Sequence, residues 1–301
     1  MHRERSTDEI ARSRRRPEVR TVAAVGLAVL GLLIPSLGTA ASRVTCDPFA
    51  VPALASFLAS RAGEVTAGTL DPRSGRLYLY HPGEPEVTAS VVKVDILAAL
   101  LAQAQAAHEQ LSAAEVSTAA TMIEDSNNVA AQELWNQIGG FGLSRVKRGT
   151  GGYYAIASFD RRLGLTQTTT NWAWGLVTTT PRDQLRLLRA IFEPSPVLSP
   201  ASQAFERSLM EDVIASQRFG IPDGVPTSAT VGVKDGWFWT TSTGWQVNSI
   251  GAVDGGPTDY LAAVMSARDP SEVYGEATVS TVGALLWRVE SQRAKVCESP
   301  A

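Results

Sequence analysis

The sequence predicts an α+β fold in which an antiparallel five-stranded sheet is packed by terminal helices and carries an inserted all-helical lobe. Three observations support this. β-rich runs occur early in the chain and again after residue 230, a long segment between them has mainly helical periodicity, and both ends of the chain that follows residue 40 are helical in pattern. We therefore expect an α/β part of residues 41–89 and 227–301 and a helical lobe of residues 90–226, with a cleft between them.

The first 40 residues have the pattern of a secretory signal peptide. Seven arginines precede a 13-residue apolar run, Val22–Ile34, which is followed by Pro35 and the small residues GTAAS. Cleavage is expected near Ala40 or Ala41. Because a spanning helix needs about 20 apolar residues, an uncleaved membrane anchor is the less favoured alternative. The sequence predicts a secreted or extracytoplasmic protein that touches a membrane only if this segment is retained.

The remaining elements follow in order. Residues 48–62 have an amphipathic helical pattern, and residues 64–84 predict a hairpin because DPRSG supplies turn residues between two β-rich runs. Residues 90–216 are mainly helical, with interruptions at GGFG, at RGTGGYY and in the loop TQTTTNWAWGLVTTTPRD. The later expected elements are three strands, residues 231–238, 244–256 and 258–267, and a last helix, residues 272–289.

Charge and cysteine content narrow the classes of function. Removing residues 1–40 takes away seven arginines and four acids, so the formal net charge changes from −3 to −6. Such a domain is a poor candidate for nucleic-acid binding, which depends on clustered Lys and Arg. No zinc-site spacing occurs and no cofactor is expected. Cys46 and Cys297 lie near the two ends of the mature chain, and a disulfide between them is favoured over free thiols in an oxidising compartment.

The segment TASVVKVDILAALLAQAQ, residues 88–105, places a hydroxyl and an amine at the start of an apolar helix. Ser90 and Lys93 are three residues apart, so their side chains can lie within hydrogen-bond reach. A lysine entering a core is costly unless it has partners or a chemical task. The S-x-x-K pattern is weak by itself, because a lysine snorkelling from a partly buried helix explains Lys93 equally well.

Two more motifs follow along the chain. Ser126 and Asn128 have S-x-N spacing just before a helical segment, where an N-capping serine is an equally good interpretation. Lys234, Asp235 and Gly236 form a K-D-G motif on an expected strand, a sequence that is ordinarily an exposed edge or turn. Each motif is ambiguous alone, and their order along the chain is what makes them informative.

In this order the motifs resemble the S-x-x-K, S-D-N and K-T-G set of class A β-lactamases and penicillin-binding proteins. The segments ASVVKVDILAALL, EDSNNVAAQELWNQIGG, TTTPRDQLRLLRAIF and GIPDGVPTSATVGVKDG are similar to their counterparts in the class A β-lactamase-like serine hydrolases, over nearly the whole mature chain. The resemblance implies that Ser90 is the nucleophile, that Lys93 is its base and that Ser126 relays a proton. Its implied substrate-binding groups are Asn128, Lys234, the position of Asp235, Gly236, and the backbone N–H groups of Ser90 and Trp237 as an oxyanion hole.

The base role sets a requirement on Lys93. Only a neutral amine can take the Ser90 proton, so the pKa of Lys93 must fall from about 10.4 towards 7, at a cost of about 4 kcal/mol. Burial and a second cation would supply this shift, and Lys234 is a candidate for that cation. Lys234 could also attract the carboxylate of a penicillin or a D-Ala peptide.

One departure from the family pattern concerns deacylation. Class A β-lactamases carry a glutamate, in the loop before the TTTP segment, that activates water. Between Glu133 and Glu193 this chain has no glutamate, and its acids there are Asp160 and Asp183. Capping at a helix start explains Asp183, and ion pairs with the adjacent arginines 161 and 162 are expected for Asp160. We therefore expect slow deacylation.

A second departure is Asp235, where the family has Thr or Ser. An ionised Asp235 would repel a substrate carboxylate and partly neutralise Lys234, unless strand alternation turns it away from the cleft. The indoles of NWAWG and GWFWTTSTGW could line the cleft, but packing is the favoured role for most of them.

Three functions are consistent with these residues. The first is a serine hydrolase acylated at Ser90 by β-lactams or related cell-wall amides, and the second is a D,D-peptidase-like enzyme acting on cell-wall peptides. The third is a non-catalytic member that binds a cell-wall fragment or a partner protein, which the intact Ser90 and Lys93 disfavour. A Ser-His-Asp mechanism has little support because the histidines are only His2, His81 and His108.

Overall fold

The computed structural model describes residues 46–138, 151–256 and 259–297. Contacts divide the chain into two units, residues 1–42 and 43–301, and every described residue belongs to the second. The predicted signal segment lies outside the described residues. Cys297 ends the last helix, but its side chain also lies outside them, so the Cys46–Cys297 disulfide stays a prediction.

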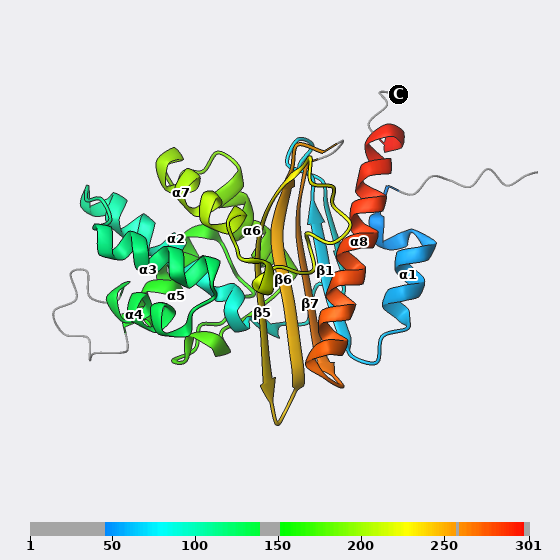
Figure 1. The fold of residues 1–301 in the computed structure, drawn as a ribbon, viewed down its shortest axis with the longest axis horizontal. Helices are drawn as coiled ribbons and strands as arrows, with labels where there is room; N and C mark the ends of the chain where they lie inside the picture. Colours follow the sequence, from blue (N-terminus) through cyan, green and yellow to red (C-terminus); the bar gives the residue numbers. More distant parts are fainter. Residues whose placement is uncertain (1–45, 139–150, 257–258, 298–301) are drawn as a thin grey trace, which may run out of the picture. The chain divides into compact units, whose positions relative to one another are not determined.

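Five antiparallel strands form one sheet in the order β2-β1-β7-β6-β5 (Figure 1). The strands are β1 (Glu64–Leu70), β2 (Leu77–Tyr80), β5 (Thr230–Thr240), β6 (Gly244–Asp254) and β7 (Tyr260–Asp269). β1 pairs with β7 along its whole length, from Glu64 opposite Ala267 to Leu70 opposite Leu261. This pairing joins the early and late strands in one sheet, which confirms the predicted architecture. It leaves β5 at one edge.

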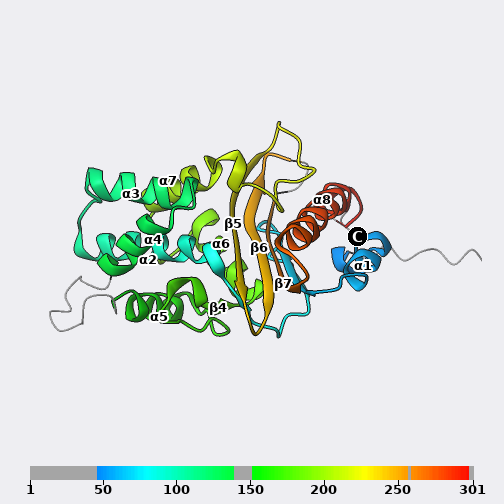
Figure 2. The ribbon, with the colours of Figure 1, turned by 60° about the horizontal axis from the view of Figure 1, so that its bottom comes forward.

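Helices from both ends of the described chain cover one face of the sheet, as Figures 1 and 2 show. The predicted helix 48–62 is corrected to a 3-10 turn, η1 (Pro48–Ala50), followed by α1 (Pro52–Ala59). Val51 is extended because a residue before proline avoids the α region, and Pro52 then begins a new helix. The last helix, α8 (Glu272–Cys297), continues beyond the predicted end at residue 289.

Helices lie on the opposite side of the sheet from α1 and α8 (Figure 2). They are α2 (Val92–Ala107), α3 (Ala113–Glu124), α4 (Asn128–Ile138), α5 (Gly151–Leu163), α6 (Pro181–Phe192) and α7 (Pro200–Glu211). α2 contacts α3, α4, α5 and α7. Within the described residues, the helical stretch Ala89–Ala107 is long and apolar enough to cross a membrane, but 78% of its apolar window is buried inside the fold, as in the core helix of a soluble protein.

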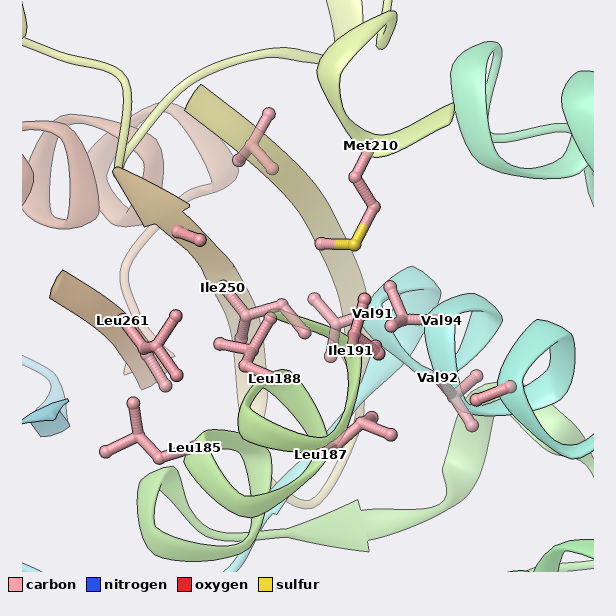
Figure 3. Packing of buried hydrophobic residues seen from close by; sticks show 14 of the residues in the cluster. Val91, Val92, Val94, Leu185, Leu187, Leu188, Ile191, Met210, Ile250 and Leu261 are labelled. Carbon is pink, nitrogen blue, oxygen red and sulfur yellow. The ribbon is translucent and has the colours of Figure 1, made fainter. Parts of the chain in front are cut away.

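α6 packs its apolar face against the sheet. Thr180 and Pro181 begin the helix as N-cap and first residue. Figure 3 shows Leu185 and Leu188 pointing toward the sheet, where Leu261 and Ile250 lie, and all four side chains are at most 2% exposed. Burial of each such side chain contributes about 1.5–3 kcal/mol. α6 thereby fixes the sheet relative to the helices that carry the candidate site.

A two-stranded sheet joins two loops near the start of α2. β3 (Glu86–Val87) pairs with β4 (Thr178–Thr179), and the Thr88 N–H donates to the Val177 carbonyl oxygen at 2.8 Å. Short 3-10 turns adjoin the two strands: η2 (Ala89–Val91) follows β3, and η3 (Trp174–Leu176) precedes β4. The pairing therefore holds η3 against η2, and these turns are in contact.

Candidate active site

Ser90 lies in η2, the tight turn that leads into α2. Ala89 before it has φ of +49°, in a left-handed conformation that costs a non-glycine residue about 1–3 kcal/mol. β6 holds this segment, because Asn248 Nδ2 donates to the carbonyl oxygens of Val87 at 2.8 Å and Thr88 at 3.1 Å. Buried hydrogen bonds thus maintain a strained turn, and Ser90 remains partly exposed.

Lys93 places its amine beside the Ser90 hydroxyl, as the helical spacing predicted. Its Nζ lies 3.0 Å from Ser90 Oγ, 3.1 Å from Ser126 Oγ, 2.8 Å from Asn128 Oδ1 and 2.5 Å from the Ser126 carbonyl oxygen. The side chain is fully buried. Burial, and to a lesser degree the Lys234 ammonium, lowers the pKa of Lys93 to about 7. A substantial fraction of this amine is therefore neutral near pH 7.

Ser126 connects the two lysines. Its Oγ lies 2.9 Å from Lys234 Nζ and 3.1 Å from Lys93 Nζ. The N-cap interpretation of Ser126 is wrong, because Asn127 Oδ1 accepts from the first N–H groups of α4 instead. Ser126 itself has φ of +55°, a second strained residue at the site. Its hydroxyl is placed to pass a proton to or from either amine.

Lys234 reaches this cluster from the edge strand β5. It is fully buried, and besides Ser126 its Nζ donates to the backbone carbonyl of Asp235 at 3.0 Å. Burial lowers the pKa of Lys234, and the Asp235 carboxylate opposes the shift. The structure therefore brings together the side chains of Ser90, Lys93, Ser126, Asn128 and Lys234, from three separate parts of the chain.

The prediction that Asp235 is one of the substrate-binding residues is wrong, because its side chain lies outside the site. It points to the opposite face of β5 from Lys234, where it is fully buried and its Oδ2 accepts from the Phe219 N–H at 2.7 Å. Burial raises the pKa of Asp235, and hydrogen bonds with Ser249 and Phe219 oppose that rise. The carboxylate therefore holds the backbone of Phe219, on the face of β5 opposite to Lys234.

Exchange of Asp235 tests this placement. In Asp235→Asn the amide oxygen can still accept from Phe219, so we expect acylation rates with carboxylate-bearing substrates to change less than about tenfold, below 1.4 kcal/mol. Asp235→Thr should lower the melting temperature, because the partly buried Phe219 N–H would lose its partner, at a cost of about 1 kcal/mol. Thermal melts and acylation kinetics check both variants. A selective gain with carboxylate-bearing substrates in both would mean that the charge acts on the ligand.

Gly236 brings β5 against the nucleophile turn. A Cβ on Gly236 would lie 2.5 Å from the Ser90 backbone nitrogen and 2.8 Å from that of Val91. Only a residue without a side chain allows this approach. The next residue, Trp237, is partly exposed and its ring lies 5.9 Å from that of Phe219.

The fold and sequence comparisons agree with this geometry. A model described as the β-lactamase enzyme family matches residues 109–289, more than half of the chain. The chain belongs to this family. The match begins after Ser90 and Lys93, so the placement of these two residues rests on the structure itself.

Solved β-lactamases share the fold at low sequence identity. Class A enzymes from Bacteroides cellulosilyticus and Mycobacterium abscessus give TM-scores of 0.65 and 0.64, with 15% and 19% identity. The matches cover 79% and 78% of this chain and 95% and 97% of the respective enzymes. In sequence, the chain is 26% identical over 235 residues to "Putative lipoprotein LppW" of Mycobacterium tuberculosis, covering 74% of this chain and 69% of LppW. The predicted β-lactamase-like family and fold are confirmed.

The two acids between Glu133 and Glu193, Asp160 and Asp183, have other contacts than Ser90 and Lys93. Asp183 accepts from the Gln167 N–H at 2.6 Å and pairs with Arg186 at 3.0 Å, so it fastens the loop to α6. The expected ion pairs of Asp160 with its neighbouring arginines are wrong, since both are exposed, whereas Asp160 is buried beside Asp95 and burial raises the pKa of both carboxyls. Within the described part of the chain, none of the hydrogen bonds of Ser90 or Lys93 involves a carboxylate.

Trp174 is a site residue that the sequence did not single out. Its indole ring centroid lies 5.2 Å from Lys93 Nζ, and its Nε1 donates to Gln132 Oε1 on α4 at 3.2 Å. The only sequence signal for this residue was its indole in the loop NWAWG, and packing was the predicted role for most indoles of that loop. The pairing of β3 with β4, which positions this loop, has no sequence pattern of its own because each strand has two residues.

Proposed function

We propose that this protein is an extracytoplasmic serine hydrolase acylated at Ser90 by β-lactams or related cell-wall amides, with slow deacylation. The supporting observation is the buried Lys93 amine, 3.0 Å from Ser90 Oγ, with a pKa lowered to about 7. Family membership supports serine-hydrolase chemistry and substrates of the β-lactam or peptide type.

In the proposed acylation, neutral Lys93 takes the proton of Ser90, and Oγ attacks the carbonyl carbon of the substrate amide. The backbone N–H groups of Ser90 and Trp237 would stabilise the oxyanion, since Gly236 brings β5 against the Ser90 turn. The C–N bond then breaks, and the departing nitrogen takes the proton of Ser126 Oγ. Lys93, 3.1 Å from that oxygen, returns a proton to Ser126.

Two residues would hold the substrate. Lys234 carries a positive charge at the site and would attract the carboxylate of a penicillin or of a peptide ending in D-Ala. Asn128 would hydrogen-bond the substrate amide, although its Oδ1 is already bonded to Lys93, so its Nδ2 is the group that would face the substrate. No nucleic acid is an expected partner of this acidic domain.

Intact-protein mass spectrometry after exposure to a penicillin tests the proposal. We expect an adduct of the mass of the intact β-lactam on the wild-type protein and none on Ser90→Ala. A chromogenic cephalosporin assay run in parallel should show slow turnover. An adduct that persists in Ser90→Ala, or no adduct with any β-lactam or peptide probe, would contradict acylation at Ser90 and would favour a binding role.

A D,D-peptidase-like activity on cell-wall peptides is the second candidate. It is favoured because, among the described residues, no carboxylate forms a hydrogen bond with Ser90 or Lys93, whereas efficient β-lactamase action in class A enzymes uses such a group. Release of terminal D-Ala from a synthetic D-Ala-D-Ala peptide, measured beside β-lactam turnover, separates the two candidates.

The description of LppW as a putative lipoprotein supports an extracytoplasmic, membrane-anchored location for this protein as well.

The pH dependence of acylation should report the pKa of Lys93. Because the neutral amine is the base, the rate should rise with pH through about pH 7. Burial is the larger cause of the lowered pKa, and Lys234→Gln removes the smaller one, the neighbouring cation, so the rising limb should move to higher pH. Lys234→Arg keeps the charge and serves as the control. A limb that stays in place in Lys234→Gln would show that the two amines do not interact.

A further inference from the structure

Trp174 lies beside the buried amine of Lys93. Four oxygen atoms of Ser90, Ser126 and Asn128 lie within hydrogen-bond distance of Nζ, and the centroid of the indole ring lies 5.2 Å from it. Lys93 is 0% exposed, and Trp174 is partly exposed. The partly exposed indole is therefore a neighbour of this amine that can shield it from the solvent.

Two attachments hold the indole in this position. The Gln132 side chain of α4 accepts a hydrogen bond from Trp174 Nε1. The backbone that follows η3 is fastened to the segment before Ser90 through the Thr88–Val177 hydrogen bond and the β3–β4 pair. The ring is thus fixed to both walls of the site, from α4 on one side and from the nucleophile turn on the other.

A covered amine affects hydrolysis more than acylation. The Ser90 hydroxyl is already within hydrogen-bond distance of Lys93, so proton transfer in acylation needs no access for water. Hydrolysis of an acylated Ser90 requires a water close to both the ester carbonyl and a base. Among the described residues around Ser90, Lys93 is the side chain able to act as that base, and the indole occupies space next to its amine.

We propose that Trp174 is a positioning residue that sets the lifetime of the acyl-enzyme by keeping water away from the Lys93 amine. The inference rests on the proposed acylation of Ser90. In the step that the indole hinders, a water oxygen bonds to the acyl carbon and gives its proton to neutral Lys93. The bond between that carbon and Ser90 Oγ then breaks, Ser90 Oγ takes the proton from Lys93, and the carboxylic acid product leaves.

The rates of adduct formation and adduct decay, measured separately with a penicillin by time-resolved intact-protein mass spectrometry, test this role. In Trp174→Leu we expect adduct decay to accelerate at least about tenfold. This is a modest part of the 10²–10⁴-fold that a positioned base contributes. The rate of adduct formation should fall by a smaller factor than the rate of decay rises. Gln132→Leu removes the anchor of the indole and should accelerate decay by a smaller factor. Trp172→Leu is the matched control, since Trp172 lies in the same loop, is 56% exposed and stacks on Tyr153 at 4.2 Å.

The outcomes separate this role from a structural one and from the proposed function. A loop that merely lost its packing would slow adduct formation in Trp174→Leu and leave decay unchanged, and that result would overturn the inference while acylation at Ser90 stood. Equal acceleration in Trp172→Leu would also overturn it. If Trp174→Leu does not fold, an unchanged decay rate in Gln132→Leu decides against the inference. Absence of any wild-type adduct would instead remove the proposed function, and the inference with it.

Discussion

Replacing Lys93 with methionine should slow the acylation of Ser90 by about 10²–10⁴-fold, the usual contribution of a positioned general base. The amine is fully buried and 3.0 Å from the hydroxyl that must lose its proton. Methionine has a similar length and no basic nitrogen, so the variant removes the base with little change in volume. The second-order rate of adduct formation with a penicillin, followed by intact-protein mass spectrometry, measures the loss.

Lys93→Arg separates a base from a mere positive charge at this position. A guanidinium remains protonated at every pH that the protein tolerates, so it cannot accept the Ser90 proton. We therefore expect Lys93→Arg to be as slow as Lys93→Met. If the arginine variant kept most of the wild-type rate, the side chain at position 93 would act through its charge, and the base would have to be sought elsewhere. Circular dichroism spectra of both variants establish that they fold.

The residue spacing predicted the local part of the site. Only the family resemblance predicted that the three distant motifs come together in one site. Helical spacing alone placed Ser90 beside Lys93. The contacts of Lys93 with Ser126 and of Lys234 with Ser126 join residues far apart in the chain, and periodicity carries no information about such pairs. The same limit applied to the sheet, because strand composition predicted the strands β1 and β7 and an antiparallel sheet but not the pairing of these two strands.

Other features were hidden because they depend on backbone conformations that several residues determine together. The left-handed conformation of Ala89 is maintained by Asn248 on β6, and no local motif at residue 89 signals it. Strand alternation indicated that Asp235 and Lys234 point to opposite faces of a regular strand, but not whether the strand is regular there. In the structure Asp235 lies on the face where it accepts a hydrogen bond from the Phe219 N–H. The position of Trp174 depends on the pairing of β3 with β4, two strands of two residues each, which composition does not predict.

Replacing Gly236 with alanine should reduce the rate of acylation by about 10²-fold, because a displacement of about 1 Å at a catalytic group has an effect of that size. The added Cβ would meet the backbone nitrogens of Ser90 and Val91 at 2.5 and 2.8 Å, and backbone atoms cannot rotate away as the end of a side chain can. β5 must then move away from the nucleophile turn. This movement would separate the two backbone N–H groups of the proposed oxyanion hole, those of Ser90 and Trp237.

Gly232→Ala is the matched control for this displacement. Gly232 lies on the same strand and faces the same side as Gly236, but its added Cβ would meet the tip of the partly buried Phe192 ring at 2.8 Å, a group that can rotate. Its acylation rate should stay within about tenfold of wild type, a change of less than 1.4 kcal/mol. If both alanine variants lost activity equally, the loss would come from the strand as a whole. If Gly236→Ala acylated at the wild-type rate, the approach of β5 to Ser90 would not determine the geometry of the reaction.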